Sequence, residues 1–160
     1  MKESFLIDNN TCLDESISSS SIKSKDLLRL KGKVDKPFMM SSIYTELNFD
    51  FEPIYKRHNE EKNLVTIICV NKTTEIPYEI LELGNQGNIT FMQPNPRFTF
   101  TISTGSYIID PKFLDFVFED QDVTIEDIIK YCLKKGQKIG VFIIPSSSFK
   151  DIRKIPLFVD

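Results

Sequence analysis

The stretch Leu64-Val65-Thr66-Ile67-Ile68-Cys69-Val70 is apolar on both of its alternating faces. Successive side chains of a strand point to opposite faces, so a strand of this kind is covered by other elements on both sides. The pattern therefore predicts the central strand of a sheet, from which we interpreted the neighbouring segments outward.

Several further segments show the alternation or the apolar runs of strands. Residues 43–52 alternate before the central strand and predict a half-buried strand. Residues 76–83 follow it and end at the turn residues of 84–87. We expect 88–92 and 97–103 to form a hairpin with four side chains facing the core, namely Phe91, Phe98, Phe100 and Ile102.

A helix is expected near the end of the chain. Thr124 is a suitable N-cap with Asp127 three residues later, and an apolar face follows at helical spacing. Residues 139–144 then predict a buried strand that ends at Pro145. Together the segments predict an α+β fold, with a mainly antiparallel β-sheet of about six strands and one amphipathic helix (about 124–135) near the C-terminus packed on one face.

Length and composition predict one soluble domain. The 160 residues, 41% of them apolar, include no alanine, which indicates a compositional bias that weakens lysine- and asparagine-based signals. We expect a polar, Ser/Lys-rich N-terminal arm over 1–36 and a single α+β domain over 37–160. The first ten residues do not resemble a secretion signal, so we expect a cytoplasmic protein of a microbial cell or a virus-infected host cell, with no membrane association.

Few residues suggest catalysis. His58 is the only histidine, and its polar surroundings predict a solvated loop between two strands. Residues 145–148 follow a buried strand and could present backbone amides to a phosphate, but Ser148 and Asp151 are explained more simply as a capping pair. No motif indicates a metal site or a cofactor, and the three widely spaced cysteines indicate reduced thiols.

Charge is distributed unevenly along the chain. Seven carboxylates between residues 110 and 127 face a single lysine, and we call this segment the acidic strip. A net charge of −3 argues against a general nucleic-acid binder and favours a basic protein partner. Candidate partner-binding residues lie in the strip and in the loop before residue 98: Asp110, Asp115, Phe116, Glu119, Asp120, Asp122, Asn95 and Arg97.

These observations favour a small protein-binding or inhibitor module. It would resemble an immunity protein, or a protein that disarms a host factor, and would engage a basic partner through the acidic strip. The alternative is a small enzyme or ligand-binding protein with a site assembled from dispersed residues, which a deep pocket with a perturbed carboxylate or lysine would reveal.

Overall fold

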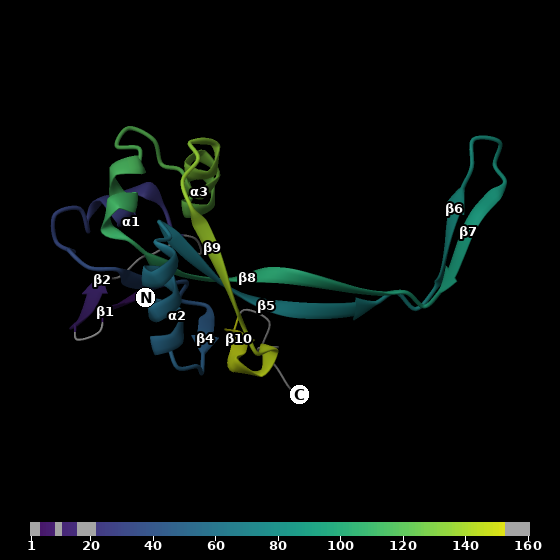
Figure 1. Cartoon of the computed structure of the whole chain (residues 1–160), viewed down its shortest axis with the longest axis horizontal. Helices are drawn as coiled ribbons and strands as arrows, with labels where there is room; N and C mark the ends of the chain where they lie inside the picture. The colour runs from purple at the N-terminus through teal and green to yellow at the C-terminus, as the bar shows by residue number, and fades with distance from the viewer. Residues whose placement is uncertain (1–3, 9–10, 16–21, 153–160) are drawn as a thin grey trace, which may run out of the picture.

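A computed structural model of the chain describes the backbone of residues 4–8 and 11–15 and all atoms of residues 22–152 (Figure 1). The main sheet has six strands in the order β2-β1-β3-β8-β5-β9. In that order their bounds are Thr11–Glu15, Ser4–Asp8, Phe38–Ser41, Arg97–Ile109, Val65–Glu75 and Ile139–Ile144. Strand β5 pairs antiparallel with β8 and parallel with β9.

Two smaller sheets and five helical segments complete the described part of the chain. Strand β4 (Thr45–Leu47) pairs with β10 (Phe149–Asp151), and β6 (Glu79–Leu83) pairs with β7 (Ile89–Pro94). The α-helices are α1 (Ser24–Leu28), α2 (Glu52–Glu61) and α3 (Ile125–Lys134). The 3₁₀-helices are η1 (Pro111–Phe116) and η2 (Ser146–Ser148).

A separate hydrophobic core covers each face of the main sheet. Val65 belongs to the core under α1, η1 and α3, whereas Ile68 belongs to the core under α2. Residues 22–30 also enter the first core, where Ile22, Leu27 and Leu30 are almost fully buried. Strand β5 is therefore buried on both faces along its first half, as the sequence predicts for residues 64–70.

The predicted fold class is wrong in its architecture. The main sheet is mainly antiparallel, as predicted, with one parallel pairing between β5 and β9, but the arrangement of the helices differs from the prediction. Helices cover both faces of the sheet, and β9, η2 and β10 follow α3 in the chain. Thr124 does cap α3, accepting a hydrogen bond from the backbone of Asp127. However, α1 and α2 are present besides α3, and α3 is not the last element of the described chain.

The predicted strand over residues 43–52 is also wrong over most of its length. Only Thr45–Leu47 is extended, as β4, and α2 begins at Glu52. Pro53 stands in the first turn of α2, where its missing amide proton costs nothing. The alternation of apolar side chains nevertheless reflects burial, since Leu47, Phe49 and Phe51 pack against the second core.

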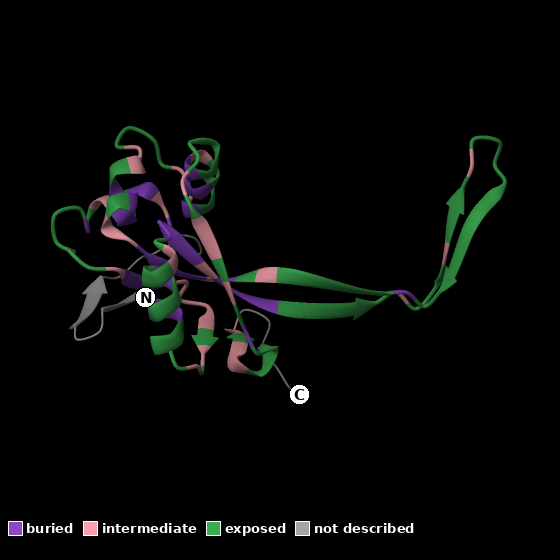
Figure 2. Ribbon diagram, viewed as in Figure 1, coloured by how far each residue is buried: buried purple, intermediate pink, exposed green. Residues whose placement is uncertain are grey.

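The outer halves of β5 and β8 leave the body as a two-stranded ribbon, and the β6–β7 hairpin continues from its end (Figure 1). We call residues 71–101 the extension. Nearly all of it is exposed, in contrast to the inner halves of the same strands (Figure 2). No helix among the described residues is long and apolar enough to cross a membrane.

The predicted hairpin of 88–92 with 97–103 is wrong. Strand β7 pairs with β6, and β8 pairs with β5 instead. Phe91, Phe98 and Phe100 do not face the core, because they are 46%, 39% and 54% exposed. The turn at 84–87 is correct: Gly87 has a φ of 76°, and the amide of Gly84 donates to the carbonyl of Asn88 over 2.8 Å.

Candidate functional site

A β-bulge in β8 marks the point where the extension leaves the body. Ile68 pairs with Ser106 but Cys69 pairs with Ser103, so Thr104 and Gly105 are extra residues on β8. Gly105 has a φ of 77°, which favours glycine. The Thr104 hydroxyl donates to the Ile68 carbonyl over 2.8 Å and holds the bulge closed. Bulges of this kind often lie beside functional sites.

A cavity of about 750 Å³ lies against this bulge. Its lining comes from six places in the chain: Ile22 before α1, the segment from Ser42 to the start of β4, the middle of β5, β8 around the bulge, the start of α3, and the segment from η2 to β10. The volume is in the range of small-molecule sites. Its polar lining side chains are Ser42, Thr45, Asn71, Lys72, Ser103, Thr104, Tyr107, Glu126, Ser146, Lys150 and Asp151.

Tyr107 and Glu126 form a polar pair in this lining. Tyr107 is 2% exposed, and its hydroxyl donates to Glu126 Oε1 over 2.9 Å. Burial, and then the neighbouring Glu126 carboxylate, raise the pKa of the Tyr107 phenol well above its ordinary value. Tyr107 therefore remains a hydrogen-bond donor at any physiological pH and holds the Glu126 carboxylate in place. A carboxylate has further acceptor positions, which a ligand hydroxyl can use.

Other hydrogen bonds fix the remaining walls. Thr45 Oγ1 donates to the Thr104 carbonyl over 2.6 Å, which ties the start of β4 to the bulge. Ser146 Oγ donates to the Asn71 carbonyl over 2.7 Å, and the Asn71 side chain accepts from Thr101 Oγ1 over 2.9 Å. The cavity is thus formed before any ligand binds.

The charged groups of the cavity are of both signs. Lys150 Nζ lies 3.6 Å from Glu46 Oε2, so that its charge is partly compensated. The Lys72 side chain forms no ion pair or hydrogen bond with any described residue, which leaves its ammonium group free to meet an anionic ligand. Among the described residues, no group of three or more His, Cys, Asp or Glu side chains is arranged to hold a metal ion.

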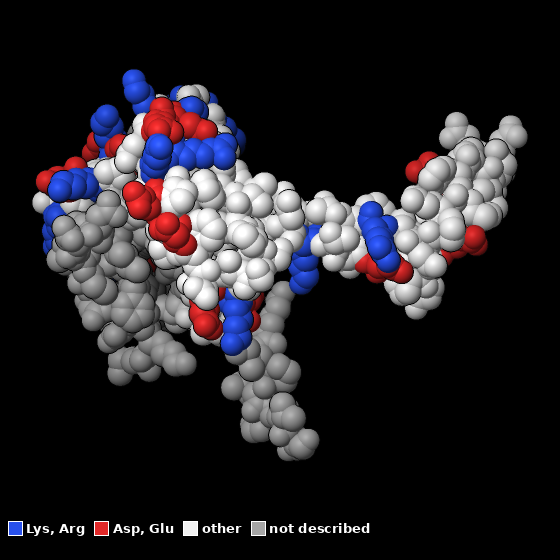
Figure 3. Space-filling model, turned by 60° about the horizontal axis from the view of Figure 1, so that its bottom comes forward, with Lys and Arg blue, Asp and Glu red and all other residues white. Residues whose placement is uncertain are grey.

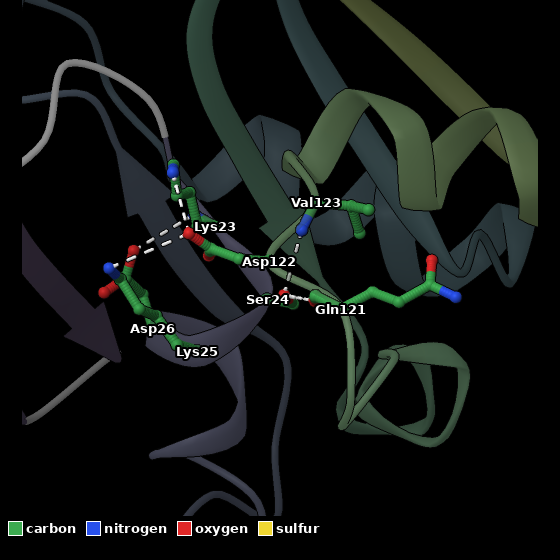
Figure 4. Close-up of polar contacts among 7 residues, drawn as sticks. All are labelled: Lys23, Ser24, Lys25, Asp26, Gln121, Asp122 and Val123. Atoms are coloured by element: carbon green, nitrogen blue, oxygen red, sulfur yellow. Dashed lines mark hydrogen bonds and ion pairs between the residues drawn. The ribbon is translucent and has the colours of Figure 1, made fainter.

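Apart from Glu126, the carboxylates of the acidic strip lie outside the cavity, and three of them, Glu119, Asp122 and Asp127, form ion pairs within the chain. Lys23 Nζ is 2.8 Å from Asp122 Oδ2, and this contact lowers the pKa of the Asp122 carboxyl (Figure 4). Lys25 Nζ lies 3.9 Å from the same oxygen, and Lys31 Nζ lies 3.4 Å from Glu119 Oε1. Accordingly, acidic and basic side chains lie beside one another on the body in Figure 3.

Hydrogen bonds of Ser24 with backbone groups of the strip reinforce this junction with α1 (Figure 4). The Ser24 hydroxyl donates to the Gln121 carbonyl and accepts from the Val123 amide over 3.2 Å. Ser24 is 1% exposed, and its own amide donates to the Val123 carbonyl over 2.9 Å. The strip therefore serves as the docking site for α1.

The other predicted partner-binding residues are dispersed. Asp110 accepts from the Lys112 amide and caps η1, and Phe116 packs against the first core. Asp115 and Asp120 are exposed. Asn95 and Arg97 lie on the extension, far from the strip, where Arg97 pairs with Glu75 over 2.8 Å (Figure 1). The structure does not bring these residues together as one surface.

The expectation that His58 is a solvated loop residue is wrong. His58 lies in α2 and is 1% exposed, with Nδ1 2.9 Å from Thr66 Oγ1. Asn63 Nδ2 donates to the same hydroxyl over 3.1 Å, and Gly140 leaves room for this amide. Burial lowers the pKa of His58, although the Asp110 carboxylate opposes the shift. His58 does not line the cavity.

Comparison with solved structures finds the same fold in proteins of low sequence identity. HddC from Yersinia pseudotuberculosis is 14% identical with a TM-score of 0.55, and the match covers 85% of this chain and 59% of that one. Its complex with GMP-PN is 13% identical, with the same TM-score and coverage. A putative glucose-1-phosphate thymidylyltransferase from Bacillus anthracis, in complex with a sucrose, is 14% identical with a TM-score of 0.53, over 80% of this chain and 55% of that one.

The chain thus spans less than two thirds of these neighbours. No protein-family model and no curated protein matches its sequence. The hypothesis of an immunity-protein-like inhibitor is wrong, because the solved structures that share this fold include a putative glucose-1-phosphate thymidylyltransferase. The ion pairs of Glu119 and Asp122 explain the error, because the charges assigned to a basic partner are used to dock α1.

Proposed function

We propose that this chain binds a phosphorylated sugar, or the sugar-phosphate part of a nucleotide sugar, in the cavity at the β8 bulge. The observation that carries the proposal is the lining of that cavity, where hydroxyl, carboxamide, carboxylate and ammonium groups surround about 750 Å³. A sugar offers many hydroxyls that both donate and accept hydrogen bonds, so it requires a lining of this mixed kind.

The neighbours support the same class of ligand. One is a putative glucose-1-phosphate thymidylyltransferase with a bound sucrose, and another holds GMP-PN. A sugar phosphate bound here would be the acceptor in a nucleotidyl transfer.

Two side chains have distinct parts in the proposal. Lys72 places an unpaired ammonium group in the lining, where it meets the phosphate as a point charge. Glu126, held by the Tyr107 hydroxyl over 2.9 Å, accepts hydrogen bonds from sugar hydroxyls. A ligand with both groups therefore binds better than one with either alone.

Isothermal titration calorimetry with glucose 1-phosphate, glucose and inorganic phosphate tests the proposal. We expect glucose 1-phosphate to bind most tightly, and Lys72→Gln to weaken it by roughly 10-fold to 100-fold, the loss of one hydrogen bond to a charged group. Lys112→Gln is the matched control, because Lys112 is exposed on η1 outside the cavity. Equal affinities of the two variants, or no binding of any of the three probes at millimolar concentration, would overturn the proposal.

A further inference from the structure

The extension exposes most of the large apolar side chains that reach solvent. Of eleven exposed large hydrophobic residues among the described ones, eight lie between residues 78 and 100. They include Leu81, Leu83, Ile89 and Met92 on the hairpin and Phe98 and Phe100 on the ribbon. Exposed apolar groups concentrated in this way mark an interaction surface rather than ordinary scatter.

The two faces of the ribbon differ in whether their side chains have partners within the chain. On one face, side-chain contacts join three cross-strand pairs: Thr73–Thr99 over 2.8 Å, Asn71–Thr101 over 2.9 Å and Glu75–Arg97 over 2.8 Å. On the other face, Phe98 and Phe100 stack with ring centroids 6.4 Å apart. The side chains of the polar face are paired with one another across the strands. The aromatic face, in contrast, has no cover among the described residues (Figure 2).

A two-stranded ribbon with no cover is only marginally stable in water. The extension is paired solely through its own strands, so a second surface must contribute to its stability. The aromatic face is continuous with the second core, where Val70 and Ile102 are its inner members. A surface laid on this face would therefore extend an existing core outward.

We propose that the extension is the interface of a homodimer, in which the aromatic face of one copy lies on that of a second copy. The six side chains named above, four on the hairpin and two on the aromatic face of the ribbon, are each about half exposed and together offer roughly 500 Å² of apolar surface. A standard interface takes about 800 Å² from each partner, somewhat more than half of it apolar. The extension alone therefore supplies the apolar area that one partner of such an interface contributes.

Charge fixes the relative direction of the two copies. The root of the extension carries Lys72, whereas the hairpin carries Glu79 and Glu82 and no lysine or arginine. Few charged side chains interrupt the rest of its surface (Figure 3). An antiparallel arrangement with twofold symmetry brings the root of each copy to the hairpin of the other, so that opposite charges meet.

Sedimentation equilibrium of the full chain without ligand tests the inference. We expect twice the 18.5 kDa of one chain at micromolar concentration. Phe98→Thr with Phe100→Thr removes four rings from each dimer and weakens association by at least roughly 100-fold. The matched control, Thr99→Ser with Thr101→Ser, changes the polar face, keeps its hydroxyls and leaves the dimer intact.

The arrangement has its own test. Glu79 shares a face of β6 with Leu81 and Leu83, so Glu79→Lys weakens the antiparallel dimer, and adding Lys72→Glu restores it, since the exchanged charges still meet. A monomeric wild-type protein at every concentration, or a phenylalanine double variant that associates as tightly as the wild type, overturns the inference. Failure of the charge exchange to restore association overturns the antiparallel arrangement. Because every readout is a mass without ligand, these outcomes are independent of sugar-phosphate binding.

Discussion

Replacing Gly105 by alanine tests whether the bulge is held by conformation and close packing. Gly105 has a φ of 77°, and a Cβ there would lie 3.3 Å from Ser42 Cβ. A left-handed conformation costs alanine roughly 1–2 kcal/mol, of which a less flexible unfolded state returns roughly 0.4–1 kcal/mol. The close contact adds about 1 kcal/mol. Gly105→Ala should therefore reduce the free energy of unfolding by about 2 kcal/mol.

Gly136→Ala is the matched control for this experiment. Gly136 has a φ of 73°, but nothing lies within 4 Å of a Cβ at that position. The free energy of unfolding of Gly136→Ala should therefore fall only by the conformational part, about 1 kcal/mol. Urea denaturation followed by circular dichroism measures both variants, and an unchanged m-value shows that the two-state comparison holds.

A double-mutant cycle with Ser42→Gly isolates the packing part, because it removes the atom that the new Cβ meets. The coupling energy between Gly105→Ala and Ser42→Gly should be about 1 kcal/mol in the favourable direction. A loss for Gly105→Ala no greater than that for Gly136→Ala, together with a coupling energy of zero, would refute the reasoning about the bulge.

Three further predictions concern buried polar groups. The free energy of unfolding should fall as the pH drops below about 6.5, because the unfolded chain protonates His58 more readily than the folded chain does, and urea denaturation should show that His58→Gln reduces this slope. Ser24→Ala should cost roughly 1–3 kcal/mol in the same assay, since the part-buried Val123 amide loses its acceptor; an unchanged midpoint would contradict the docking of α1 on the acidic strip. Tyr107→Phe should weaken glucose 1-phosphate binding more than inorganic phosphate binding in calorimetry, because it releases Glu126 and leaves Lys72 in place; equal losses for both ligands would argue against that division of roles.

Local signals in the sequence were informative where they depended on burial alone. Residues 64–70 are apolar at every position, and β5 is buried on both faces there. The same rule failed for residues 97–101, because alternating Phe and Thr indicate a strand with one apolar face but do not say what covers that face. The hairpin of 88–92 with 97–103 was inferred from adjacency, whereas β8 pairs with the more distant β5.

The candidate site could not be predicted because its residues are unremarkable one by one. Ser42, Asn71, Lys72 and Glu126 belong to no motif, and they meet only because the sheet places β5 and β8 beside the start of α3. The acidic strip was a stronger signal in the sequence, but α1 neutralises it through contacts 88 to 99 residues apart. Opposite charges within one chain can pair with each other, and the paired charges are then less available to a partner.

The bulge at Thr104 and Gly105 explains why one pair of strands can serve two purposes. On its inner side, β5 and β8 are part of a sheet with a core on each face; on its outer side, they are a ribbon with no core of its own. The cavity lies at the boundary, where Asn71 and Ser103 already belong to the ribbon while Tyr107 is still buried. A sugar phosphate would therefore contact both parts, and the aromatic face can change without disturbing Tyr107 or Glu126. The phenylalanine variants therefore test the homodimer without altering Tyr107 or Glu126, whereas Lys72 belongs to both proposals and its variants are compared without ligand.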